Sequence, residues 1–271
     1  MTTELPRLTL SQACHFQGRG LHSGVPVSVM VKPGEDGIAF WSGAMRTPAV
    51  PESVVETQRC TALRDVATIE HLMSALAGLG ITDAEIEVSG PEMPAMDGSA
   101  LPFVEGLFSA GTEQIGTLSV TGPYARVFHV DGSIKIAIAQ GDGHWRYEYA
   151  TGDRWPYEQA AEYRLENRTY TEQIAPARTF AMEEEIAMIR QAGLAKGLDE
   201  TSALVIGQAG YVNKARYSDE PARHKLLDLI GDLALAGVPA AALGVVSSRS
   251  GHRTNVAAAA KLVSHVEIRR I

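Results

Sequence analysis

Apolar and polar positions along the chain repeat with two periods, two residues and about 3.6 residues, which predict strands and helices respectively. Up to residue 110 they predict strands at 25–31, 38–41 and 84–88, and helices at 69–79 and 101–110. Thr68 stands where the first helix should begin, so we expect its side chain to cap that helix. Ser99 holds the same place before the second helix, beside an Asp-Gly turn.

A glycine- and threonine-rich stretch with one strand, 111–122, separates these elements from a second series. The second series is predicted as strands at 126–129, 134–139, 145–149, 163–171, 203–206 and 241–246, and helices at 182–192 and 221–236. Strands followed by helices, without regular alternation, are typical of α+β folds. We therefore predict two α+β domains, 1–117 and 118–271.

One helix in each half carries a weak internal similarity. In the first helix, a short apolar run separates His71 from a final Ala-Leu-Ala-Gly. In the second helix, a longer run separates His224 from the same four residues. The distance from histidine to glycine is 7 residues in the first helix and 13 in the second. Apolar helices often end in alanine and glycine, so chance similarity and duplication of one unit are both open.

The composition disfavours several classes of protein. Lysine and arginine number 24 and aspartate and glutamate 32, a net charge of −8 that disfavours non-specific binding to nucleic acid. Cys14 and Cys60 are too few for a disulfide framework or a cysteine-rich zinc ribbon. No signal peptide is recognisable, and the most apolar stretch, 226–246, contains two aspartates. We expect a cytoplasmic protein without stable membrane insertion.

Polar residues inside an apolar helix predict a metal site. His224, Asp228 and Asp232 follow one another at intervals of four residues, so on a helix they form one stripe. Buried carboxylates are unfavourable unless they are paired or bound to metal. Histidine and aspartate one turn apart can both ligate one zinc ion. The alternative is that the stripe is the solvent-exposed face of the helix.

Glu70 and His71 begin the other apolar helix. Neighbouring residues on a helix point about 100° apart, so one could ligate a metal while the other acts as a general base. Alternatively, Glu70 interacts with the helix dipole and His71 is a buried histidine without a catalytic role. Together, His71, His224 and Asp228 would supply three ligands and leave one coordination position free, as in catalytic zinc sites. Fe(II) also suits this donor set.

Seven motifs resemble, in order along nearly the whole chain, those of the UDP-3-O-acyl-N-acetylglucosamine deacetylases, the zinc enzymes of lipid A synthesis. The matching segments are Gly20–Gly24 (GLHSG), Arg59–Leu63 (RCTAL), Thr68–Ile81 (TIEHLMSALAGLGI), Met96–Ala100 (MDGSA), Arg178–Phe180 (RTF), Arg223–Asp232 (RHKLLDLIGD) and Ser250–His252 (SGH). Each motif alone is weak, but an ordered series is highly specific. The sequence therefore resembles this family throughout.

The resemblance implies a role for each matching residue and a fold. His71, His224 and Asp228 match the zinc ligands, and Glu70 matches the general base. Lys225 and His252 match the active-site cations, and Asp232 matches the carboxylate that orients the histidine. Thr179 matches the hydroxyl beside the reacting carbonyl, and Phe180 matches a substrate-contacting aromatic residue. In the family fold, two similar α/β-sandwich layers pack with their helices inward and the metal site between the halves.

The implied reaction is zinc-dependent hydrolysis of the N-acetyl group of UDP-3-O-acyl-N-acetylglucosamine, with release of acetate, by a monomer. A first alternative is the same chemistry on another N-acylated sugar or nucleotide sugar. A metal-dependent phosphoesterase is a second, disfavoured because the sequence offers no second metal cluster. A non-catalytic α+β module that binds RNA or protein is a third, and the net charge of −8 disfavours RNA.

The segments around the catalytic motifs depart from the family. Ala181-Met182 replace Gly-Phe, Gly197-Leu198-Asp199 replace a glycine pair with serine, and Pro221-Ala222 replace Phe-Val. Residues 142–176, where the family builds much of its acyl-chain passage, resemble it least. This segment contains Trp145, Tyr147, Tyr149, Trp155, Tyr157 and Tyr163. Aromatic residues line apolar pockets, although strands favour them too. We expect them in the passage, and an acyl preference other than myristoyl.

Overall fold

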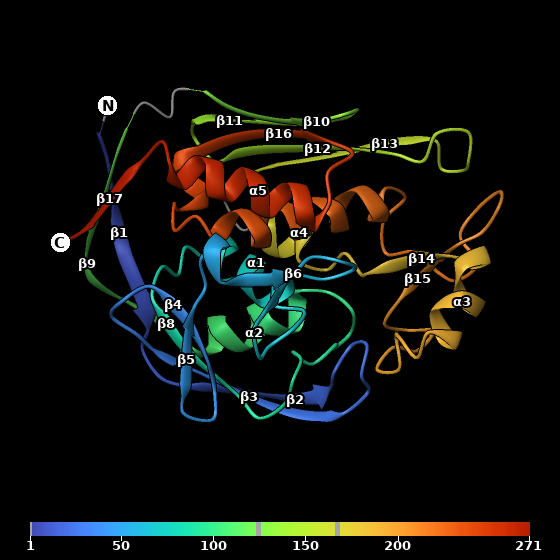
Figure 1. Ribbon diagram of the computed structural model, residues 1–271, viewed down its shortest axis with the longest axis horizontal. Coiled ribbons are helices and arrows are strands. Elements are labelled where there is room, and N and C mark those ends of the chain that lie inside the picture. Colours follow the sequence, from blue (N-terminus) through green and yellow to red (C-terminus); the bar gives the residue numbers. More distant parts are fainter. Residues whose placement is uncertain (1, 123–125, 166–168) are drawn as a thin grey trace.

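Two five-stranded sheets form the outer layers of the molecule, and four helices, α1, α2, α4 and α5, lie between them (Figure 1). The computed structural model describes residues 2–122, 126–165 and 169–271. Apolar residues alternate along the strands, so that Ala84, Ile86 and Val88 face the helices and are buried. The fold is the predicted α+β sandwich with its helices inward.

The elements of the first half are β1 (Thr2–Leu10), β2 (Cys14–Arg19), β3 (Pro26–Pro33), β4 (Ile38–Ser42), β5 (Met45–Pro48), β6 (Val54–Glu56), β7 (Ala62–Leu63), α1 (Glu70–Gly78), β8 (Ala84–Val88), α2 (Leu101–Ala110) and β9 (Thr112–Thr121). Those of the second half are β10 (Val127–Asp131), β11 (Ile134–Gln140), β12 (His144–Ala150), β13 (Glu158–Arg164), β14 (Phe180–Met182), α3 (Ile186–Gln191), β15 (Leu204–Ile206), α4 (Glu220–Ala234), β16 (Leu243–Ser248), α5 (His252–Val263) and β17 (Glu267–Arg270).

The two outer sheets have the same topology. Their strand orders are β2-β3-β8-β4-β5 and β10-β11-β16-β12-β13, and each contains one parallel pair, β4 with β8 and β12 with β16. In each half a central strand follows one helix and precedes another, so α1 corresponds to α4 and α2 to α5. The weak similarity around His71 and His224 therefore lies on equivalent helices of a duplicated unit.

A third sheet, β1-β9-β17, joins the two ends of the chain. Its central strand, β9, pairs antiparallel with β1 and with β17. The predicted division between residues 117 and 118 falls inside β9, and the two-domain boundary stays a prediction. Among the described residues, no helix has both the length and the apolar character needed to cross a membrane.

Most predicted elements are present within a few residues of their expected bounds, but three expectations are wrong. The strand predicted at 163–171 ends at Arg164, residues 166–168 lie outside the described part, and a π-helical turn follows at Tyr170–Ile174. Tyrosine and threonine favour a strand there, but Tyr170 instead buries its ring against Tyr163. The helix predicted at 182–192 starts at Ile186, since Phe180–Met182 pairs with β15.

The third wrong expectation concerns the start of α1. Thr68 has a positive φ of 61° and does not cap the helix; its hydroxyl donates a hydrogen bond of 3.0 Å to Glu92. Ser99 behaves nearly as expected, because its oxygen accepts a hydrogen bond from the amide of Leu101 at the start of α2. Helix α5 was not predicted, and it places His252 in its first turn.

Helices α1 and α4 cross closely at Gly231. A methyl group added there would lie 2.1 Å from the carbonyl oxygen of Glu70. We expect Gly231→Ala to push the helices apart. Overpacking of this kind costs about 1–3 kcal/mol of stability, and the better helix propensity of alanine offsets about 1 kcal/mol of that cost. Thermal unfolding and metal content measure the effect. Gly210→Ala is the control, because a methyl group there has no neighbour within 4 Å, and equal Tm values for both variants would contradict the prediction.

Candidate active site

Three inward-facing helices bring the predicted site residues together. Helix α1 supplies Glu70 and His71 from its first turn, and α5 supplies His252. Helix α4 supplies the predicted stripe of His224, Asp228 and Asp232, and also Lys225. Apart from Lys225 and His252, which are partly exposed, these side chains are buried. The stripe on α4 is therefore not a solvent-exposed face, and the alternative interpretation is wrong.

His71, His224 and Asp228 form one cluster, in which one nitrogen or oxygen atom of each lies within 4.8 Å of the others. Asp228 Oδ1 lies 3.4 Å from His224 Nε2 and 3.8 Å from His71 Nε2. The two imidazole rings are nearly perpendicular, with their centroids 5.1 Å apart. This buried Oδ1 has no hydrogen-bond partner among the described residues. A buried carboxylate oxygen facing two imidazoles, without a hydrogen bond, is what a metal site requires.

The protonation states of the cluster suit a cation. Burial lowers the pKa of His71 to about 3, and burial also lowers the pKa of His224, so both rings are neutral. His224 Nδ1 lies 3.1 Å from the carbonyl oxygen of Ala177, and a proton on Nδ1 leaves the Nε2 lone pair free. Burial raises the pKa of Asp228, but His224 and Lys225 lower it more, so the net shift is downward. Two neutral imidazoles and one carboxylate fit a divalent metal ion.

Glu70 lies beside this cluster as a buried carboxylate. Its Oε2 accepts a hydrogen bond of 2.9 Å from the amide of Thr61, in the segment between β6 and α1. Burial raises the pKa of Glu70 to about 7. A carboxyl group with a pKa near neutrality is well matched to accepting a proton during catalysis.

His252 and Asp232 form a second pair next to the cluster. His252 Nδ1 lies 3.0 Å from Asp232 Oδ2, and Asp232 also accepts hydrogen bonds from the Thr61 hydroxyl and the Asn255 amide. Burial lowers the pKa of His252, but Asp232 and Asp228 raise it more, to about 9. An imidazolium therefore persists at neutral pH, with its orientation fixed by a fully buried carboxylate.

Lys225 and Phe180 close the site on another side. Lys225 Nζ lies 2.7 Å from Asp228 Oδ2 and 5.6 Å from the centroid of the Phe180 ring. Burial lowers the pKa of Lys225, but Asp228 raises it more, so the ammonium stays charged. Phe180 packs edge-on against His224 at 5.9 Å. Lys225 thus brings a permanent positive charge to within reach of the metal cluster.

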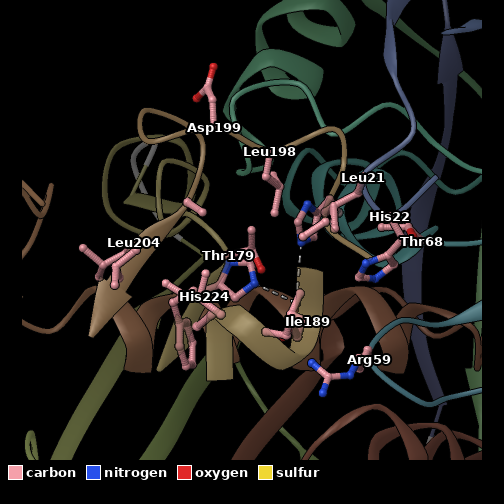
Figure 2. A pocket seen from close by; sticks show the side chains of 18 of the residues that line it. Leu21, His22, Arg59, Thr68, Thr179, Ile189, Leu198, Asp199, Leu204 and His224 are labelled. Carbon is pink, nitrogen blue, oxygen red and sulfur yellow. Dashed lines mark ion pairs between the residues drawn. The ribbon is translucent and has the colours of Figure 1, made fainter. Parts of the chain in front are cut away.

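Apart from Asp232, the predicted site residues line a cavity of about 770 Å³. Figure 2 shows His22 and Thr68 toward one end of the cavity and Leu204 toward the other, with Thr179 and His224 between them. Aliphatic residues of α3, β15 and the loop between them form the apolar part of the wall: Ile186, Ile189, Leu198 and Leu204. The cavity therefore combines a polar reaction centre with apolar space.

The prediction that aromatic residues of segment 142–176 line this cavity is wrong. Trp145, Tyr147 and Tyr163 belong to the hydrophobic core, because β12 and β13 are strands of the sandwich. Trp155 and Tyr157 line a separate cavity of about 460 Å³. Much of the wall comes instead from residues 179–205, which removes the structural reason for expecting the aromatic residues to set an acyl preference.

Sequence reasoning missed several residues that shape the site. His22 lines the cavity with both ring nitrogens buried and without a hydrogen-bond partner among the described residues. Its loop is fixed because Glu92 accepts hydrogen bonds from the amides of His22 and Ser23. The GLHSG motif was the available signal. Arg59 also lines the cavity, with a positive φ of 68°, and the RCTAL motif that begins with it was the available signal.

Comparisons with known proteins agree with this site. The model of the family LpxC, UDP-3-O-acyl N-acetylglycosamine deacetylase, matches residues 7–264. A UDP-3-O-acyl-N-acetylglucosamine deacetylase from Leptospira biflexa is 34% identical, over 98% of this chain and 92% of that protein. A protein of the same name from Myxococcus xanthus is 36% identical, over 95% of this chain and 85% of that protein. One from Geobacter sp. (strain M21) is 37% identical, over 91% of this chain and 85% of that protein. The chain therefore belongs to the UDP-3-O-acyl N-acetylglycosamine deacetylase family.

Proposed function

We propose that this protein hydrolyses the N-acetyl group of UDP-3-O-acyl-N-acetylglucosamine with a zinc ion, releasing acetate, in lipid A biosynthesis. One observation carries the proposal: the buried, unpaired Oδ1 of Asp228 faces His71 and His224 beside the raised-pKa carboxyl of Glu70. Relatives covering nearly the whole chain carry the name of this activity. The proposal includes a monomeric enzyme in the cytoplasm.

His71, His224 and Asp228 would hold the zinc ion, which when bound supplies Lewis-acid polarisation of a carbonyl and acidification of water. Glu70 accepts the proton of the attacking water as the C–O bond forms at the acetamide carbon. The Thr179 hydroxyl donates a hydrogen bond to the carbonyl oxygen as it becomes negative, and the Lys225 ammonium stabilises the same charge. His252 donates its proton to the amide nitrogen as the C–N bond breaks, which releases acetate and the amine.

The direct test is incubation of the zinc-loaded protein with a defined UDP-3-O-acyl-N-acetylglucosamine. Acetate and the free amine should appear in equal amounts. Turnover only of another N-acetylated nucleotide sugar would favour the first alternative. A phosphoesterase would release phosphate or a nucleotide instead. That alternative is disfavoured because, in the part of the chain that the structure describes, this is the one group of three such side chains whose ligand atoms lie close enough together to hold an ion.

The paired base and acid predict a bell-shaped dependence of log kcat/KM on pH. The reaction needs His252 protonated, and its pKa is raised to about 9, so kcat/KM should fall as the pH rises through about 9. Asp232→Asn removes the largest influence that raises this pKa, so the basic limb should move to lower pH. His252→Gln should flatten the limb. The acidic limb belongs to Glu70 and the metal site together.

The measurement is log kcat/KM against pH for wild type and the two variants, with zinc content checked across the range. Wild type at two ionic strengths controls for general effects of charge. If the basic limb of His252→Gln stays where it is in wild type, another group such as Lys225 titrates there. His252 would then bind substrate at most.

A further inference from the structure

The segment of residues 175–179, which we name the strap, is held by a hydrogen bond at every residue. It crosses from the π-helical turn to β14 and ends at Thr179 in the cavity wall. The bonds are Ala100 N to Ala175 O at 3.0 Å, Arg216 Nη1 to Pro176 O at 2.7 Å, His224 Nδ1 to Ala177 O at 3.1 Å, Arg178 N to Glu220 Oε1 at 3.0 Å, and Thr179 N to Gly98 O at 2.8 Å.

Arg216 joins the strap to the first half of the chain. Its guanidinium donates through Nη1 to Pro176 O and through Nη2 to Asp97 Oδ2, at 2.7 and 2.9 Å. Its own amide donates to Glu220 Oε2 at 2.6 Å. Asp97 is fixed in turn, since its other oxygen accepts the amide of Ser99 at 3.0 Å. The planar guanidinium of an arginine holds two such acceptors in one fixed geometry, whereas the donors of a lysine ammonium rotate freely.

The MDGSA motif forms the opposite side of the strap. Gly98 has a φ of 80°, and a methyl group added there would lie 1.6 Å from the carbonyl oxygen of Ser202. Its own carbonyl accepts the amide of Thr179, while the carbonyl of Thr179 accepts the amide of Leu204 in β15. The backbone of Thr179 is thus held on both sides, which fixes the point in the cavity wall from which its side chain projects.

We propose that Arg216, acting with the Asp97–Ser99 turn, is a positioning residue that holds the Thr179 hydroxyl toward the reacting carbonyl. This inference rests on the proposed function, in which Thr179 stabilises the carbonyl oxygen. The inference also gives the MDGSA motif a role, because the strap is held against the loop of this motif by Arg216 and Gly98. Arg216 is half-exposed and contacts neither the metal cluster nor Glu70 in any contact that the structure gives.

If Arg216 had only a structural role, a different experimental result would be expected. Its ion pair with Asp97 is 31% and 32% exposed, and pairs of this kind contribute little to stability. A loss of activity through unfolding would lower Tm and affect kcat and KM without regard to Thr179. A positioning role acts through one hydroxyl, so its effect should disappear when that hydroxyl is absent.

The kinetic test is a double-mutant cycle with Arg216→Ala and Thr179→Val on the zinc-loaded enzyme. Arg216→Ala should lower kcat by about 10- to 100-fold, the scale for small misplacements at a reaction centre, with KM and zinc content nearly unchanged. In the Thr179→Val background the same substitution should lower kcat by less than about threefold. Equal effects of Arg216→Ala in both backgrounds would overturn the inference.

Arg46→Ala is the matched control, because Arg46 forms a comparable pair with Glu85, 28% and 23% exposed, at 2.8 Å. It also bonds a backbone carbonyl, that of Asp36, but lies on β5, away from the cavity lining. We expect its kcat to equal that of wild type. If Arg46→Ala loses as much kcat as Arg216→Ala, the effect is structural and the inference falls.

Hydrogen exchange supplies a readout that needs no substrate. In Arg216→Ala the amides of Arg178 and Thr179 should exchange at least about tenfold faster than in wild type, because the strap loses its bond at Pro176. In Arg46→Ala they should exchange at the wild-type rate. Unchanged exchange in Arg216→Ala would overturn the inference even if the deacetylase assignment holds. If wild type fails to release acetate, the proposed function falls, and the exchange result still decides whether Arg216 holds the strap.

Discussion

Replacing Glu70 with alanine should lower kcat by about two to four orders of magnitude, the usual scale for a general base, and leave about one zinc ion bound per chain. The reason lies in the geometry, because Glu70 is beside the metal cluster but its Oε2 accepts the amide of Thr61 instead of joining the three ligands. Deacetylation kinetics and metal analysis on the same sample measure both quantities.

Glu70→Gln is the second variant for this experiment. A glutamine can still accept the hydrogen bond from the Thr61 backbone amide, so that buried N–H keeps its partner. The glutamine side chain cannot, however, take a proton from water. Its kcat should fall nearly as far as that of Glu70→Ala, with Tm close to wild type. Zinc loss in parallel with kcat would show that Glu70 is a ligand and not a base.

His224→Ala should lower zinc affinity and activity together. His224 Nε2 faces the unpaired Oδ1 of Asp228 at 3.4 Å, and its removal takes one of three protein ligands from the ion. The loss should exceed the 10- to 100-fold that removal of an outer partner typically causes. Zinc titration against a chelator of known affinity measures it, since metal content at saturation hides modest changes.

His22→Ala is the control for this variant. His22 lines the same cavity but lies outside the group of three ligand atoms, so its removal should leave zinc affinity at the wild-type value. Equal zinc affinity in His224→Ala and wild type would show that the ligand assignment is wrong. A fall in zinc affinity in His22→Ala of the same size would show that general disruption of the cavity explains both.

The chemistry of the site could be predicted from the sequence because its residues conflict with their surroundings. Histidine and aspartate at helical spacing inside leucine-rich segments carry a signal that spacing alone can show. His252 gave no such signal, since α5 is rich in alanine and its first turn follows a glycine. Its role depends on Asp232, 20 residues earlier in the chain. Spacing along one helix cannot show a contact of that kind.

The strap and the cavity wall were beyond sequence reasoning for a related reason. Arg216 acts through a backbone carbonyl and through Asp97, 119 residues away, and such long-range bonds leave no local pattern. Residues 180–206 have a mixed pattern because their short parallel strands, β14 and β15, form a separate two-stranded sheet outside the sandwich. The helix predicted at 182–192 begins too early, because Met182 is the last residue of β14 and a 3-10 turn at Glu183–Glu185 precedes α3.

The duplicated topology implies that recognition and chemistry can change independently in this molecule. In each half a segment is inserted at the same topological position, between the fourth strand of the sheet and the following helix: residues 49–69 in the first and 165–219 in the second. Both segments reach the one cavity, with Arg59 and Thr68 from the first and Thr179 to Val205 from the second. The helices behind them carry the proposed metal ligands and Glu70. Substitutions at positions such as Leu198 can therefore remodel the walls without moving the residues on these helices, so one reaction can be fitted to substrates of different shape.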